Sequence, residues 1–207
     1  MAADSPAEYS GAKLTAGWRR TSRLRLFVGI EVDDAARDLA GRTIAHLQRA
    51  GVEGRFEPRE KLHVTVAFLG AVAAERLPEV IGALDAVRVA RFTFPLERIG
   101  AFPNLRRPRI AWLSSQRPQP AFRRCVAAVQ EALAPLGFRF ERAPDARPHM
   151  TFARLRPGGE PLQVSFGPAK RTLVTVDTLT LFVSLPDAGS TRYEVVYRRA
   201  LRSHASS

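Results

Sequence analysis

Two histidines stand in the same short pattern in this sequence, and that pattern is suited to acid–base chemistry. His63 opens the stretch H-V-T-V and His149 opens the stretch H-M-T-F, so each imidazole is followed two residues later by Thr65 or Thr151. The chain contains only 4 histidines, so half of them occupy this arrangement. A single H-x-T motif is weak evidence, but its repetition favours a shared functional role.

Paired imidazoles could cleave a phosphodiester without a metal ion. This reaction needs one group that takes a proton from the attacking water and another that gives a proton to the leaving oxygen. Imidazole suits both tasks, because its ordinary pKa of about 6.5 allows one copy to be neutral and the other protonated. The threonine hydroxyls could donate hydrogen bonds to the phosphate oxygens. The alternative is that both histidines are half-buried strand residues and both threonines only favour β-structure.

Other catalytic sites find less support. A zinc site needs three or four ligands, and neither motif carries a second histidine, cysteine or carboxylate nearby. The sequence has no G-x-x-x-x-G-K-[ST] loop and no G-x-S-x-G elbow. Its single cysteine, Cys125, lies among apolar residues at helical spacing, so we expect a small buried side chain and no intrachain disulfide. We therefore expect no metal site and no cofactor.

Each motif ends a similar strand–helix–strand unit. In the first unit, a strand from residue 24 precedes a helix over about 35–50. Leu62, Val64, Val66 and Phe68 then alternate with the motif residues, so we expect these four apolar side chains to face the core. The second unit repeats this plan with a strand from residue 109, a helix over about 119–136 and a final strand at the second motif. This duplication predicts two lobes related by a pseudo-twofold axis, whose histidine and threonine faces line one groove.

The rest of the chain provides supporting elements and two ends. We expect a helix near 74–87, a strand near 91–99, and two late strands over 173–185 and 192–197, which together indicate a mixed α/β or α+β fold. Residues 1–22 are predicted to be a flexible leader and residues 202–207 a flexible tail. Residues 23–201 would then form a single domain.

The formal net charge of +12 favours anionic partners such as RNA or phosphates, although many arginines near the chain ends could simply be solvated. No run of about 18 apolar residues occurs, and the first 22 residues lack the apolar segment of a signal peptide. These observations predict a cytoplasmic protein that does not insert into a membrane. The absence of a coiled-coil pattern favours a monomer.

The two motifs resemble the paired H-x-T-x motifs of the two-histidine phosphoesterase superfamily. Four longer stretches resemble one branch of it, the RNA 2',3'-cyclic phosphodiesterases, also called 2'-5' RNA ligases. The similar stretches are R-L-F-V-G-I-E-V, F-E-P-R-E-K-L-H-V-T-V-A-F-L-G, I-G-A-F-P-N-L-R-R-P-R-I-A-W and R-P-H-M-T-F-A-R-L. The resemblance extends from about Leu24 to Leu201.

This resemblance implies a bilobed α+β fold, with antiparallel sheets around a central cleft, and a hydrolase that opens a 2',3'-cyclic phosphate to a 2'-phosphomonoester without a metal. It assigns His63 as proton donor, His149 as proton acceptor, and Thr65 and Thr151 as phosphate ligands. Arg154 follows the second motif where relatives often carry an arginine, and its guanidinium could bind phosphate through two N–H groups.

Phe102, in the loop G-A-F-P-N-L-R-R-P, could stack on a base. The substrates implied are RNA with 2',3'-cyclic phosphate ends or small cyclic nucleotides. Two alternatives stay open: a module that binds RNA ends without turnover, and a 2'-5' RNA ligase. The same acid and base would serve hydrolysis and ligation, so the sequence does not choose between the two directions.

Overall fold

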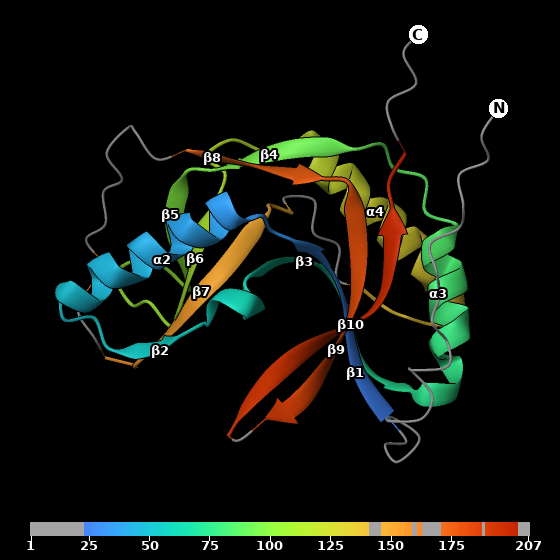
Figure 1. The fold of residues 1–207 in the computed structure, drawn as a ribbon, viewed down its shortest axis with the longest axis horizontal. Coiled ribbons are helices and arrows are strands. Elements are labelled where there is room, and N and C mark those ends of the chain that lie inside the picture. Colours follow the sequence, from blue (N-terminus) through green and yellow to red (C-terminus); the bar gives the residue numbers. More distant parts are fainter. Residues whose placement is uncertain (1–22, 141–145, 159–160, 163–170, 188, 203–207) are drawn as a thin grey trace, which may run out of the picture.

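The computed structural model describes residues 23–140, 146–158, 161–162, 171–187 and 189–202 (Figure 1). The leader predicted over residues 1–22 and residues 203–207 of the predicted tail lie outside the described residues. Arg202, the first residue of that predicted tail, is described. It forms a bridge with Ala90, and its carbonyl accepts a hydrogen bond of 2.9 Å from the Arg91 N–H.

The first strand–helix–strand unit consists of β1 (Arg23–Glu31), α2 (Asp34–Arg49) and β3 (His63–Ala73). Asp33 caps α2, because its carboxylate accepts a hydrogen bond of 2.8 Å from the Ala36 N–H. The connection to β3 contains β2 (Gly54–Phe56) and a 3-10 turn, η1 (Arg59–Lys61).

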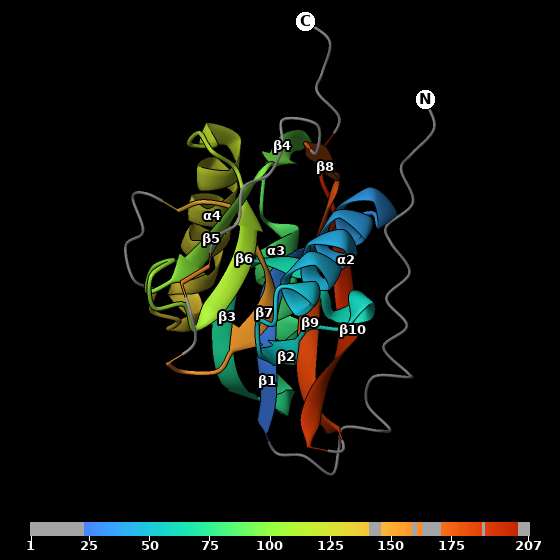
Figure 2. The same ribbon diagram turned by 90° about the vertical axis from the view of Figure 1, so that its left-hand side faces the viewer.

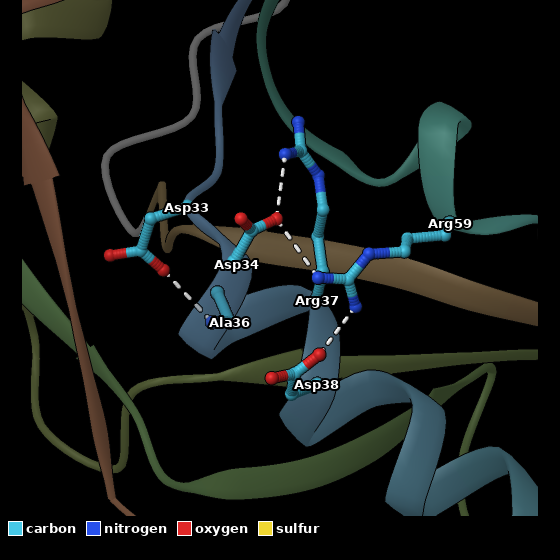
Figure 3. A network of polar contacts seen from close by, with 6 residues as sticks. All are labelled: Asp33, Asp34, Ala36, Arg37, Asp38 and Arg59. Carbon is cyan, nitrogen blue, oxygen red and sulfur yellow. Dashed lines mark hydrogen bonds and ion pairs between the residues drawn. The ribbon is translucent and has the colours of Figure 1, made fainter.

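Figure 3 shows how η1 is tied to the start of α2. The Arg59 guanidinium donates to the carboxylates of Asp34 and Asp38, and Arg37 also donates to Asp34. Exposed ion pairs of this kind stabilise a fold only slightly. Their position is nevertheless relevant to function, because η1 leads directly into the first motif.

The second unit consists of β6 (Ile110–Ser114), α4 (Pro120–Leu133) with the 3-10 turn η3 (Ala134–Leu136), and β7 (His149–Leu155). Gly137 follows η3 with a φ of 86°, a left-handed conformation that ends the helix as the sequence predicted. Cys125 lies fully buried on α4, and burial raises the pKa of its thiol to about 12. The prediction of a small buried side chain at this position is confirmed.

Two of the strands predicted from sequence are each divided in the structure. The region predicted near 91–99 forms β4 (Phe92–Leu96) and β5 (Arg98–Phe102), and the late run forms β8 (Thr172–Val176) and β9 (Thr178–Asp187). Burial alternates along β8 but is continuous over much of β9, and exposed Asp177 stands at the change. The prediction of one late strand was wrong because its two parts belong to different sheets.

The main sheet has the strand order β10-β9-β1-β3-β7-β6-β5, with β2 also paired to β7, and β4 and β8 form a small second sheet. Strand β10 spans Ser190–Ala200, and η2 (Ala74–Arg76) leads into α3 (Leu77–Asp85) after β3. The pairings between these strands are antiparallel. The α+β fold class predicted from the resemblance is confirmed.

The two halves of the main sheet meet at one residue pair. Strands β3 and β7 are joined only by Val64 and Met150, and both side chains are fully buried. Each of these residues lies between the histidine and the threonine of its motif. The two predicted motifs therefore come together at the junction between the halves.

Each long helix packs across that junction. Helix α2 follows β1 but contacts β7 and β8, whereas α4 follows β6 but contacts β3, β4 and α3. Figure 2 shows the strands between α2 on one side and α4 on the other. This exchange joins the halves through a common apolar core. No helix among the described residues is long and apolar enough to cross a membrane.

Candidate active site

Both motifs line one groove of about 570 Å³. Its lining combines the motif residues, basic and acidic side chains, aromatic rings and the β9–β10 hairpin. The lining residues are Arg25, Leu26, Phe27, Arg55, Glu57, Lys61, His63, Thr65, Phe68, Gly70, His149, Thr151, Arg154, Ser184, Leu185, Pro186, Ser190, Thr191 and Tyr193.

Strand alternation explains why the motif side chains share this groove. Val64 and Met150 point into the core, so the histidine and threonine on either side of each point to the opposite face. The single link between β3 and β7 places these two faces next to each other. The predicted common groove for His63, His149, Thr65 and Thr151 is therefore present.

His63 is held by its backbone and by aromatic rings. Its Nδ1 donates to the Lys61 carbonyl at 2.7 Å, and its Nε2 lies 3.1 Å from the Thr65 hydroxyl. The rings of Phe27 and Tyr193 lie 4.9 and 5.2 Å away between centroids. Burial lowers the pKa of His63, whereas the hydrogen bond to the carbonyl and the charge of Glu57 act in the opposite direction.

His149 uses the same backbone device in a different setting. Its Nδ1 donates to the Arg147 carbonyl at 3.1 Å, two residues upstream, as Lys61 is two residues upstream of His63. Phe102 and Trp112 lie against its ring at centroid distances of 5.7 and 6.4 Å. With Nδ1 engaged in both rings, Nε2 is the nitrogen that each histidine can use for proton transfer.

A cluster of charged side chains adjoins the motifs. Glu57 lies between two cations: one carboxylate oxygen is 3.5 Å from Lys61 Nζ and the other is 3.4 Å from Arg154 Nε. The Lys61 ammonium also lies 5.2 Å above the ring of Tyr193. Anionic ligands therefore meet a lining in which basic groups, including Arg25 and Arg55, outnumber the single carboxylate.

The two predicted substrate-binding residues lie in different places. Arg154 lines the groove, and its side chain is 54% exposed. Phe102 is 45% exposed and contacts the ring of His149, but it is not among the side chains that line the groove. Of the two, only Arg154 therefore lines the groove that both motifs share.

Several lining residues were missed from sequence. The prediction that Phe68 faces the core was wrong: its side chain is 70% exposed, because Val66 and Ala67 are both buried at an irregularity in the pairing of β3 with β1 and the alternation shifts there. Phe68 stands five residues after His63, as Arg154 stands five residues after His149. This matched spacing was a usable signal. Glu57 and Lys61 lie close to the first motif, but their proximity to Arg154 depends on the pairing of β2 with β7. Nothing in the sequence indicated that Tyr193, far along the chain, would cover His63.

Within the described ranges, no three histidine, cysteine, aspartate or glutamate residues form a group that could hold a metal ion. The groove instead brings together two imidazoles, two threonine hydroxyls and the Arg154 guanidinium. Such groups can donate several hydrogen bonds to one phosphate.

Several known proteins are similar to this chain in sequence. A family model described as LigT like Phosphoesterase matches residues 30–112. A protein of Archaeoglobus fulgidus named RNA 2',3'-cyclic phosphodiesterase is 36% identical over 135 residues, which cover 64% of this chain and 73% of that protein. A protein of Escherichia coli with the same name is 29% identical over 148 residues, covering 72% and 80% of the two chains.

Solved structures of E. coli LigT are also similar. The apo form superimposes with a TM-score of 0.71 at 26% identity, covering 87% of this chain and 99% of LigT. The complex of LigT with 3'-AMP gives a TM-score of 0.69 at 26% identity, with the same coverage. The fold and the groove thus define a phosphoesterase of the two-histidine superfamily. The chain belongs to the LigT-like phosphoesterase family.

Proposed function

We propose that this protein hydrolyses the 2',3'-cyclic phosphate of an RNA end or of a nucleotide to a 2'-phosphomonoester, without a metal ion. The observation that carries the proposal is the meeting of both motifs on one groove, with the two Nδ1 atoms engaged by backbone carbonyls. Relatives named RNA 2',3'-cyclic phosphodiesterase support the choice of substrate.

In the proposed reaction, His149 Nε2 accepts a proton from water as the water oxygen forms a bond to phosphorus. The bond between phosphorus and the 3' oxygen breaks, and His63 donates its proton to that oxygen. The product carries a 2'-phosphate and a free 3' hydroxyl. One proton enters the protein at His149 and one leaves at His63, so the two imidazoles exchange protonation states in each turnover.

This assignment requires His63 to be protonated although burial lowers its pKa. The negative charge of a bound substrate favours the imidazolium, and so does the charge of Glu57. Activity therefore needs a charged His63 and a neutral His149 at the same pH. We expect a bell-shaped dependence of kcat/KM on pH.

The remaining predicted residues would hold the substrate. Thr65 and Thr151 would donate hydrogen bonds to the non-bridging phosphate oxygens, where negative charge increases in the transition state. Arg154 would bind the same phosphate through two N–H groups. Phe102 would stack on a base that leaves the groove beside His149.

The proposal is tested with purified protein, a nucleoside 2',3'-cyclic phosphate and excess EDTA. We expect the 2'-phosphate product, and we expect His63→Ala and His149→Ala each to lower kcat by a factor of about 10²–10⁴. His46→Ala is the matched control, because His46 is exposed on α2 away from the groove. Absence of product, or full activity in both motif variants, would refute the proposal.

Binding without turnover is the second candidate, favoured by the basic lining of the groove. It predicts salt-sensitive RNA binding that survives both histidine substitutions, with no product formed. Ligation through a 2'-5' linkage would use the same acid and base in reverse. A single domain over residues 23–201, a monomeric state, a cytoplasmic location and RNA ends as the partner stay predictions.

A further inference from the structure

A buried charged pair lies beside the proposed reaction centre but has no part in the proton transfers. The Glu57 side chain is 8% exposed and the Lys61 side chain is 6% exposed, and both line the groove. Burying two charges is costly unless their contacts compensate for the lost hydration. The contacts of each partner indicate what the pair does.

The Lys61 ammonium is fully engaged within the protein. Its three N–H groups can be directed to Glu57 at 3.5 Å, to the Ser190 hydroxyl at 3.4 Å and to the Thr191 hydroxyl at 3.3 Å. These three contacts use the donor capacity of a lysine. Lys61 therefore connects the segment before β3 to the β9–β10 hairpin, and it has no donor left for a substrate phosphate.

Arg154 is engaged on one side only. Its Nε lies 3.4 Å from Glu57, and among the described residues this is its one ion pair. A guanidinium that is held through Nε keeps its two terminal NH2 groups for another partner. Because Arg154 is 54% exposed and lines the groove, these NH2 groups are accessible to an anion bound there.

We propose that Glu57 is a positioning residue of the active site, whose buried carboxylate orients Arg154 toward the substrate phosphate and holds Lys61 under the hairpin. The inference rests on the proposed function, because it takes the phosphate between the two motifs as the group that Arg154 meets. Glu57 itself touches neither the phosphate nor the attacking water.

The position of Glu57 also affects the proposed acid. The titratable groups that act on the pKa of His63 are Glu57 and Lys61 before β3 and His149 on β7. Tyr193 on β10 contributes a neutral ring, and Glu31, opposite on β1, is already engaged by Arg198 and Thr180. Glu57 is thus the nearby carboxylate whose charge supports a protonated His63.

The experiment compares Glu57→Gln with the native protein. The amide keeps the shape of the side chain but removes its charge. We expect the affinity for inorganic phosphate to fall by about tenfold, the usual loss for one charge-assisted hydrogen bond. We expect kcat/KM to fall further on the alkaline side of the pH profile than on the acidic side, because only there does activity depend on the fraction of protonated His63.

Three controls separate positioning from a general structural effect. Glu60→Gln removes a charge from exposed η1 and should change neither measurement. Glu57→Asp keeps the carboxylate and should restore the alkaline side of the profile. In an Arg154→Ala background, Glu57→Gln should cost little further phosphate affinity, because the group that it orients is gone.

If Glu57→Gln fails to fold, the double variant Glu57→Gln/Lys61→Met replaces it, since it leaves no unpaired buried ammonium. It should show the same loss of phosphate affinity. Native phosphate affinity in Glu57→Gln and in Glu57→Gln/Lys61→Met would overturn the inference. Additive losses of phosphate affinity when Glu57→Gln is combined with Arg154→Ala would also overturn it. Phosphate binding needs no turnover, so this result is distinct from a failure to hydrolyse cyclic phosphate, which would refute the proposed function instead.

Discussion

Each half of the candidate active site has its own motif strand and its own backbone hydrogen bond to the histidine. The side chains that surround the two imidazoles, however, are different. His63 is covered by Phe27 and Tyr193 and lies beside Glu57, whereas His149 contacts Phe102 and Trp112 at the other side of the groove. Only the first half carries the additional β9–β10 hairpin over its motif. Two equal sequence motifs have thus acquired unequal surroundings.

This inequality shows how a duplicated unit can supply two different proton-transfer groups. Identical side chains at symmetric positions would have the same pKa, and an acid–base pair works best when its members differ in protonation. In this protein the surroundings of His63 act on its pKa in both directions, since burial lowers it and the charge of Glu57 raises it. The following predictions test how far the two halves differ.

The largest effect should appear when the substrate no longer needs an acid. With a substrate whose leaving group departs without a proton, such as a nitrophenyl phosphodiester, we expect His63→Ala to retain most activity. His149→Ala should still lose a factor of about 10²–10⁴, because water activation is still required. Steady-state kinetics of both variants on both substrates provide the measurement. Equal losses on the nitrophenyl ester would contradict the assignment of donor and acceptor.

Two glycines, Gly29 on β1 and Gly100 on β5, should respond differently to alanine. At Gly100 a Cβ would lie 2.0 Å from Trp112 Cη2, so the indole beside His149 would have to move. At Gly29 the nearest atoms, in Phe182 and Val64, would be 3.2 Å away. We expect Gly100→Ala to cost about 1–3 kcal/mol of unfolding free energy and Gly29→Ala less. Urea denaturation measures both, and the reverse order would show that the second half is the more adaptable one.

The smallest effect concerns the pH dependence of stability. Because the folded state lowers the pKa of His63, the unfolded chain binds the proton more tightly than the folded protein. The stability that the folded protein has with a neutral His63 is therefore fully present above about pH 6.5. It is lost as the pH falls from there toward the pKa of His63 in the folded state. The slope from this one group is at most about 1.4 kcal/mol per pH unit.

Thermal or urea unfolding between pH 4 and 8 would measure this slope in the native protein and in His63→Gln. The substitution should flatten the dependence, whereas His46→Gln on the exposed side of α2 should leave it unchanged. An equally steep dependence in His63→Gln would mean that other groups cause it.

Much of the fold and the centre of the site could be predicted from local patterns. The alternation around each H-x-T motif placed Val64 and Met150 in the core and the motif side chains on the opposite face, as the structure has them. The helix that ends at Gly137 was also predicted, because a left-handed glycine is a local stop signal. These features depend on residues that are close together in the chain.

Apart from the common groove, features that depend on distant pairing were not predicted. The late run that forms β8 and β9 reads as one apolar strand, and only its partners β4 and β1 divide it between two sheets. The neighbours Glu57, Lys61 and Arg154 come together because β2 pairs with β7 and because β10 folds back over the groove.

The sequence by itself determined which residues could transfer protons and which face of each strand they occupy, because strand alternation is a local property. The tertiary structure decided that Val64 pairs with Met150, which brings both motifs to one groove. It also decided that Tyr193 covers His63 and that Thr191 contacts Lys61, since these contacts join segments more than a hundred residues apart in the chain.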